Sequence, residues 1–248
     1  MDLGLNGKRA AVAAASGGLG FATAAALAAE GVQVAICGRD QGRIGEAAAR
    51  IGVAAVGLVF DVGSADGGAA FVSATTEALG GVDILVTNAG GPPAGDFSST
   101  PLERYPEALD LNLLSVVGMC NAAVPAMRAR GWGRVVAITS ISVRQPIANL
   151  ILSNTARAGA TAFLKTLARE VAADGVTVNS LQPGLHATDR LTSLYGGDVS
   201  QAAAGIPAKQ VGRPEDFGAV AAFLCSDHAR FITGAAIPLD GGAYAGLQ

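Results

Sequence analysis

The residues with the clearest chemical potential lie near the N-terminus, in a glycine-rich stretch with the sequence AAASGGLG, residues 13–20. The stretch follows an apolar run and precedes a helical pattern. In that context, glycines let the backbone turn tightly and approach a pyrophosphate, whose charge is bound by free N–H groups at the helix N-terminus. The stretch therefore predicts a dinucleotide-binding turn. Taken alone, it is equally compatible with a packed turn that has no ligand, because Gly and Ala are abundant throughout the chain.

The choice of dinucleotide can be predicted at the end of the next apolar run, where Cys37-Gly38-Arg39 stands. An acidic residue about 20 positions after the glycines would bind the ribose 2′-hydroxyl of NAD. A guanidinium at this point can instead pair with the 2′-phosphate of NADP, so Arg39 favours NADP(H) over NAD(H). Two alternatives stay open: the adjacent Asp40 could serve NAD, and Arg39 could be a solvated surface charge.

The elements that would position these residues alternate along the chain. Apolar runs typical of buried strands cover residues 10–14, 32–37, 55–60, 84–87, 135–139, 176–181 and 236–239. Helical patterns cover residues 20–30, 66–79, 105–130, 152–173 and 214–226. This alternation predicts an α/β fold, a Rossmann-like doubly wound parallel sheet flanked by helices on both faces. With 248 residues, half of them apolar, and no internal repeat, we expect a single domain over residues 1–248.

Ligands of such sheets bind at the carboxyl ends of the strands. The least regular part of the chain, residues 185–211, contains Gly196-Gly197 and Pro207. We expect it to form a mobile flap over that edge.

Composition argues against several classes of partner. The formal net charge is −3 and the basic residues are scattered, so we expect no nucleic acid partner. Residues 10–29 are too rich in small residues for a membrane span or an export signal. Cys37, Cys120 and Cys225 are far apart, and we expect them to be reduced structural thiols of a cytoplasmic protein, with no metal site.

Further motifs follow the glycine-rich stretch in order. They are Asp61-Val62, Asn88-Ala89-Gly90, Asn112, GRVVAITS at residues 133–140, VNSLQPG at 178–184, ITG at 232–234 and DGG at 240–242. Together they resemble the short-chain dehydrogenase/reductase family over nearly the whole chain, and within it the divergent branch similar to 3-oxoacyl-(acyl-carrier-protein) reductases. The resemblance implies an oxidoreductase that reduces a carbonyl compound, or oxidises an alcohol, with a nicotinamide cofactor.

The resemblance also implies roles for individual residues. Ser140 is expected to polarise the carbonyl, Asn112 to occupy the family's helix Asn position, and Thr188 to meet the nicotinamide carboxamide. The expected cofactor contacts are Ala14, Ser16, Gly18, Leu19, Gly20, Arg39, Asp61, Val62, Asn88, Ala89, Gly90, Arg157, Pro183, Gly184 and Thr188. Plainer roles are also open: the two asparagines can bond the backbone, Asp61 can cap a turn, and Ser140 can be a turn hydroxyl.

Two departures from the family pattern are visible. Ala13-Ala14 replace the leading Thr-Gly of the turn, at a cost of about 1 kcal/mol if the backbone there needs a glycine-like conformation. Ser153 and Arg157 stand where the resemblance places the catalytic Tyr and Lys of Tyr-x-x-x-Lys. An aliphatic hydroxyl is far less acidic than a phenol of pKa about 10. Arg157 keeps the positive charge and could hold ribose hydroxyls or a developing alkoxide, but it cannot relay protons.

Loss of a positioned acid typically slows a reaction by about 10²- to 10⁴-fold. His186 or Tyr195 could replace it, unless His186 is bonded to backbone and Tyr195 is a lid contact. The chain is therefore expected to be a slow or specialised NADP(H)-dependent reductase. The alternatives are a catalytically weak or inactive dinucleotide-binding protein, acting as cofactor sensor or partner subunit, and an enzyme of non-redox chemistry.

The substrate and the assembly can be predicted only coarsely. Pro92, Pro93, Ile147 and Leu150 are apolar candidates near the site and suggest an apolar, acyl-chain-like carbonyl compound. The resemblance implies a homotetramer or homodimer that uses the long helices and the C-terminal strand.

Overall fold

The computed structural model describes residues 1–194 and 199–247, and its centre is one parallel sheet of seven strands. The strand order is β3-β2-β1-β4-β5-β6-β7. The strands are β1 (Arg9–Val12), β2 (Gln33–Gly38), β3 (Ala55–Val59), β4 (Ile84–Thr87), β5 (Gly133–Ile138), β6 (Val176–Pro183) and β7 (Ala236–Leu239). The order reverses between β1 and β4, which confirms the doubly wound sheet predicted from the sequence.

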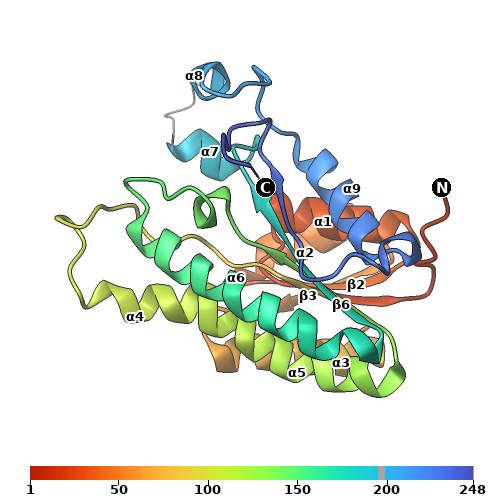
Figure 1. Ribbon diagram of the computed structural model, residues 1–248. Coiled ribbons are helices and arrows are strands. Elements are labelled where there is room, and N and C mark those ends of the chain that lie inside the picture. The colour runs from red at the N-terminus through yellow and green to blue at the C-terminus, as the bar shows by residue number, and fades with distance from the viewer. Residues whose placement is uncertain (195–198, 248) are drawn as a thin grey trace.

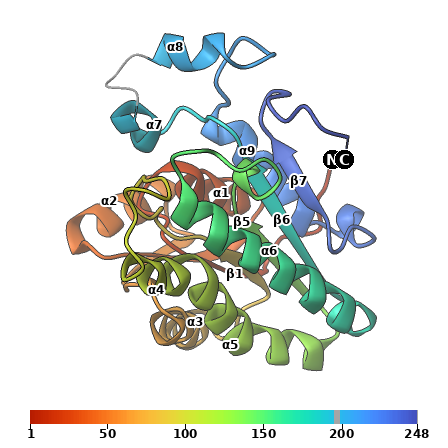
Figure 2. The ribbon, with the colours of Figure 1, turned by 60° about the vertical axis from the view of Figure 1, so that its left-hand side comes forward.

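Helices cover both faces of the sheet (Figures 1 and 2). One face carries α1 (Gly18–Ala29), α2 (Gln41–Ile51) and α9 (Pro214–Cys225). The other carries α3 (Ala65–Leu79), α4 (Arg104–Leu109), α5 (Ser115–Arg130) and α6 (Ile151–Val171). The short helices α7 (Asp189–Leu194) and α8 (Val199–Ala204) lie beyond one end of the sheet.

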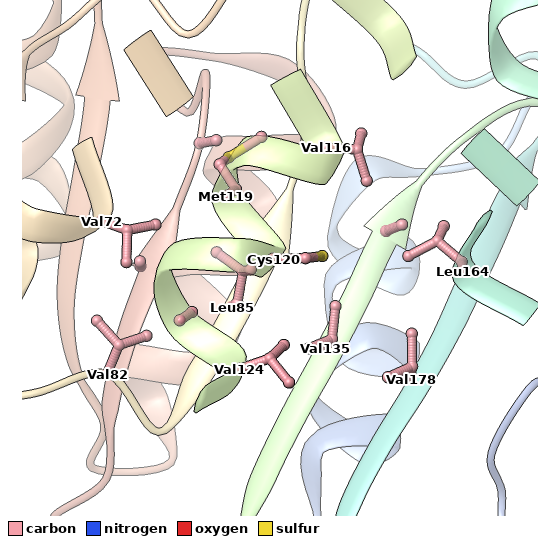
Figure 3. Close-up of a cluster of buried hydrophobic side chains, with 14 of the residues drawn as sticks. Val72, Val82, Leu85, Val116, Met119, Cys120, Val124, Val135, Leu164 and Val178 are labelled. Carbon is pink, nitrogen blue, oxygen red and sulfur yellow. The ribbon is translucent and has the colours of Figure 1, made fainter. Parts of the chain in front are cut away.

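Two hydrophobic clusters join these layers, because successive strand residues point to opposite faces. In β5, Val135 and Ala137 enter the cluster under α3, α5 and α6, whereas Val136 and Ile138 enter the other. Figure 3 shows the first cluster, where side chains of α5 such as Cys120 lie against those of the sheet. Both faces of the sheet are thereby covered, and the carboxyl ends of the strands remain as the edge at which a ligand can bind.

Three elements differ from the sequence prediction. Helix α2 was not predicted; Asp40 caps it by accepting a hydrogen bond from the Arg43 N–H (2.8 Å), and Ile44 and Ala47 bury its inner face. The predicted helix over residues 105–130 is divided by a π-helical turn, Asp110–Leu114, between α4 and α5. The region predicted as an irregular flap contains α7 and α8.

The continuous helical stretch over residues 104–130 is long and apolar enough, by composition, to cross a membrane. In the fold, the buried side chains of α5 pack against α3 and the sheet (Figure 3). The apolar composition therefore has an ordinary explanation in the core.

Candidate active site

A cavity of about 400 Å³ opens at the carboxyl ends of the central strands. The predicted cofactor residues that line it are Ala14, Ser16, Arg39, Asp61, Val62, Asn88, Ala89 and Gly90. The sequence analysis missed other lining residues, which are Gly38, Phe60, Gly63, Gly91, Arg104, Glu107, Ala108, Leu111 and Leu152. Sequence reasoning could not find the lining residues of α4, because they form no motif and meet the cavity only after folding.

The glycine-rich turn has the geometry of an anion-binding turn. Helix α1 begins at Gly18, and no side chain caps its N-terminus at Gly17, so its first N–H groups stay available. Gly18 has φ +58°, and a Cβ on Gly20 would lie only 2.8 Å from Asn88 Nδ2. These positions require glycine, and they let the turn approach a pyrophosphate.

Two asparagines hold the walls of the cavity together. Asn88 Nδ2 donates to the carbonyl of Ala14 (3.1 Å), and Asn112 Nδ2 donates to the carbonyl of Gly90 (2.9 Å). Asp61 Oδ1 accepts from the N–H of Gly63 (2.9 Å). The plainer roles of these residues, as partners of the backbone, are therefore confirmed. Asn88 and Asp61 also line the cavity, and Asn112 lines a smaller space beside it.

Arg39 is exposed at the rim of the cavity and has no hydrogen bond or ion pair with the residues that the structure describes. Asp40 points into the cap of α2 instead of pairing with it. Ser16 lies next to the end of β2, since a Cβ on Gly38 would be 3.3 Å from Ser16 Cβ. A cation and a hydroxyl thus border the same part of the cavity, as binding of a phosphate requires.

Three of the predicted catalytic residues, Ser140, Ser153 and Arg157, lie after β5 and along α6. Ser140 follows β5, and its Oγ accepts a hydrogen bond from the N–H of Ser142 (3.1 Å). With one lone pair engaged in this way, the hydroxyl hydrogen of Ser140 is left to donate to another acceptor. Ser153 is buried and lies one helical turn before Arg157 on α6.

Arg157 is held by the protein itself. Its Nη1 donates to the carbonyls of Ile138 and Thr139, each at 3.1 Å. Arg157 and Asn112 line the same small internal space of about 10 Å³, and the buried Oδ1 of Asn112 has no partner among the described residues. The fold brings these two predicted residues together, whereas neither Ser140 nor Ser153 lines either of the two cavities.

The end of β6 supplies the opposite side of the site. Pro183 ends the strand, and the Gly184 N–H donates to the Leu239 carbonyl (2.9 Å). Thr188 Cγ2 lies 3.7 Å from the position of a Cβ on Gly18. The structure therefore places Thr188 directly over the glycine-rich turn.

His186 and Tyr195 are the two residues predicted as possible replacements for the catalytic acid. The His186 ring contacts the Phe217 ring edge-on at 5.4 Å, and its Nδ1 lies 3.3 Å from the Gly184 carbonyl. Burial lowers the pKa of His186, although the Gly184 carbonyl opposes the shift. His186 lines neither cavity of the described chain, so its backbone-bonded role is the one that the structure supports. Tyr195 lies outside the described residues.

Arg144 is a residue that sequence reasoning missed. Its Nε donates to Gln182 Oε1 and its Nη2 to the Ala236 carbonyl, each at 2.6 Å. Arg144 ends the 3₁₀ turn Ile141–Val143 that follows Ser140. It therefore ties the segment of Ser140 to β6 and β7, a role for which an isolated arginine gives no sequence signal.

Of the apolar candidates, Pro92 and Pro93 lie at the cavity, and Ile147 and Leu150 lie in the segment before α6. Ile147 is pinned to α6 by Asn154, whose Nδ2 donates to the Ile147 carbonyl (2.9 Å). Leu150 forms a bridge with Gly95. The loop after β4 and the segment before α6 thus contact each other through Gly95 and Leu150.

The cysteines have no evident part in this chemistry. Cys37, Cys120 and Cys225 are free and buried, and burial raises the pKa of each thiol to about 12. Such thiols are poor nucleophiles and metal ligands. No group of three His, Cys, Asp or Glu residues in the described ranges could hold a metal ion.

Comparison with known proteins decides the family. A family model described as Enoyl-(Acyl carrier protein) reductase matches residues 13–244. The chain belongs to the short-chain dehydrogenase/reductase family. The motif resemblance is therefore confirmed, including the likeness to ketoacyl reductases.

Relatives within the family cover almost the whole chain. Dehydrogenase/reductase SDR family member 4 of Bos taurus is 34% identical over 98% of this chain and 89% of its own length. The 3-oxoacyl-(acyl-carrier-protein) reductase FabG of Vibrio cholerae is 32% identical over 98% of this chain and 99% of its own. The crystal structure of L-sorbose reductase from Gluconobacter frateurii, complexed with NADPH and L-sorbose, is 33% identical, with a TM-score of 0.92 and full coverage of both chains. The chain is accordingly an oxidoreductase of the short-chain type.

Proposed function

We propose that this protein uses NADP(H) to reduce a carbonyl compound, or in reverse to oxidise an alcohol, at an atypical catalytic centre. The observation that carries the cofactor preference is the guanidinium of Arg39, which has no hydrogen bond or ion pair with the described residues and lies beside Ser16 at the cavity rim. The glycine-rich turn and the uncapped start of α1 fit the pyrophosphate. The related L-sorbose reductase, which was crystallised with NADPH, supports the same choice.

NADPH, when bound, supplies the hydride for carbonyl reduction. The chain's own residues would orient and polarise the carbonyl. Ser140 is suited to donate a hydrogen bond to the carbonyl oxygen, because its own lone pair is engaged by the Ser142 N–H. Asn112 holds the strand end that carries Gly90. The hydrogen bond from Ser140 would stabilise negative charge on the oxygen during the reaction.

The atypical part of the proposal concerns Ser153 and Arg157, which we place where the family has its catalytic Tyr and Lys. The Ser153 hydroxyl is too weak an acid to protonate the oxygen unaided, so the proton would come from water. Arg157 adds positive charge beneath the site while its Nη1 is fixed on two main-chain carbonyls. We therefore expect turnover about 10²- to 10⁴-fold below that of a complete centre.

A second candidate is a catalytically weak or inactive dinucleotide-binding protein that serves as cofactor sensor or partner subunit. The engagement of Arg157 with Ile138 and Thr139 favours it, because a guanidinium held by backbone has less freedom to bind a ribose or an alkoxide. In this case the protein would bind the dinucleotide at the same site but would catalyse the reaction weakly or not at all.

The proposed function also includes a class of substrate, an assembly and a location in the cell. Pro92, Pro93 and the loop of Ile147 support an apolar, acyl-chain-like substrate. We propose a homotetramer or homodimer assembled through α5, α6 and the β7 region, in the cytoplasm, without nucleic acid or membrane partners. Sedimentation that shows only monomer would contradict the assembly.

The deciding experiment is titration of the purified protein with NADPH and NADH, followed by a panel of carbonyl compounds. Tighter binding of NADPH and slow turnover of an apolar ketone are expected. Binding without turnover by the wild type, together with turnover by Ser153→Tyr/Arg157→Lys, would favour the sensor or partner role. If neither nucleotide bound at millimolar concentration, the dehydrogenase function of this chain would be wrong.

A further inference from the structure

Ala14 has a backbone conformation that side chains rarely adopt. Its φ is +47°, and Lys209 is the other non-glycine residue with positive φ in the described chain. For an L-residue, this left-handed region is strained relative to glycine, because the Cβ crowds the following carbonyl. Such a conformation persists only where its surroundings enforce it, and it often marks a functional position.

The surroundings of Ala14 enforce this conformation from two strands. The Ala14 N–H donates to Cys37 Sγ (3.4 Å), and its carbonyl accepts from Asn88 Nδ2 (3.1 Å). The neighbouring Ala15 N–H donates to the Cys37 carbonyl (2.9 Å). Because β2 and β4 hold both sides of the residue, Ala14 cannot rotate to a relaxed conformation without breaking these bonds.

Ala14 also borders the cavity. It lines the cavity together with Ser16, Arg39 and Asp61, and it packs against the edge of the cluster that contains Cys37. Its N–H and carbonyl are both engaged by the protein, so the groups of Ala14 without a hydrogen-bonding role are its Cα and methyl group. A methyl group here occupies space that a glycine would leave open.

We propose that Ala14 sets the affinity of this site for dinucleotides. The inference rests on the proposed cofactor site and deepens it. The methyl group lowers the affinity for NADPH and NADH by the same factor, because it acts on the part that the two share. Arg39 acts on the 2′-phosphate alone, so it restores the lost affinity for NADPH and not for NADH. NADH therefore binds too weakly to compete with NADPH.

Two substitutions separate bulk from backbone strain. Ala14→Gly removes both, and we expect it to lower the Kd for NADPH and for NADH by about 10-fold each, the effect of one methyl group in a closely fitted site. Ala14→Asn tolerates the left-handed conformation but adds bulk, so we expect its affinity for both nucleotides to fall by about 10-fold or more. Lys209→Gly gives the same backbone relief outside the cavity and should bind as the wild type does.

Isothermal titration with NADPH and NADH, together with thermal unfolding of each variant, tests the proposal. Opposite changes of affinity in Ala14→Gly and Ala14→Asn support it, including the case in which only Ala14→Gly binds measurably. Equal affinity of the wild type and Ala14→Gly for NADPH overturns the role of Ala14 and leaves the proposed function standing. Tighter binding by both Ala14→Gly and Ala14→Asn overturns the proposal, because relief of backbone strain would then explain the change in affinity. If no form binds either nucleotide, the proposed function and this inference both fail.

Discussion

Replacement of Arg39 by Ala tests the cofactor preference most directly. Arg39 is exposed at the cavity rim and is not engaged by any described residue, so its removal disturbs no contact of the fold. The expected loss is therefore confined to the ligand. NADPH should bind more weakly to Arg39→Ala, and NADH should bind as it does to the wild type.

The magnitude follows from the chemistry of the contact. A hydrogen bond between charged groups contributes about 1.5 to 3 kcal/mol, and exposure to solvent favours the lower half of that range. At 1.4 kcal/mol for each factor of ten, the Kd for NADPH should rise by about 10- to 40-fold. Because the contact is between exposed charges, added salt should weaken NADPH binding in the wild type more than in the variant.

Titration calorimetry at two salt concentrations measures both effects. Arg43→Ala is a matched control, because Arg43 is an exposed arginine of α2 that does not line the cavity. Arg39→Asp extends the test, since a carboxylate can accept from the ribose 2′-hydroxyl and should shift the preference to NADH. Equal losses of NADPH and NADH affinity in Arg39→Ala would refute the reasoning, as would no loss at all.

Three further outcomes are expected. Arg144→Ala should lower kcat by about 10-fold or more while the Kd for NADPH is unchanged, and Arg144→Lys should recover part of it, because Arg144 positions the segment of Ser140. The free energy of unfolding should fall as the pH drops below 6.5, where unfolded His186 takes up a proton that the buried ring resists, and urea titrations of His186→Gln should show a shallower fall. Asp83→Asn should destabilise the fold by about 2 kcal/mol in urea titrations, because Asp83 accepts two side-chain hydrogen bonds of 2.8 Å from Arg9; a change below 0.5 kcal/mol would contradict this.

The thiols provide a separate check on the core. Since burial raises the pKa of Cys37, Cys120 and Cys225 to about 12, a thiol reagent at neutral pH should modify none of them before global unfolding. Labelling followed by mass spectrometry measures this. Rapid modification of the native protein would show that the core opens locally.

Much of the fold could be predicted because it depends on local pattern. The strands 84–87 and 236–239 were predicted with their observed bounds, and the other strands differ by a few residues at their ends. Helix α2 was missed since Gly42 and Gly45 weaken its helical pattern, although Asp40 followed by Ile44 and Ala47 is a usable signal. The π-helical turn, which contains the buried Asn112, had no signal in the local sequence pattern.

The sequence by itself determined the alternation of strands and helices, the glycine-rich turn, and the motif residues at the strand ends, because spacing and residue type control these locally. Only the tertiary structure decided what each side chain meets. It bonded Arg157 to the carbonyls of Ile138 and Thr139, packed His186 against Phe217, and forced a positive φ on Ala14. Each of these outcomes depends on contacts between residues far apart in the chain, and no local pattern records the partner that a side chain will find.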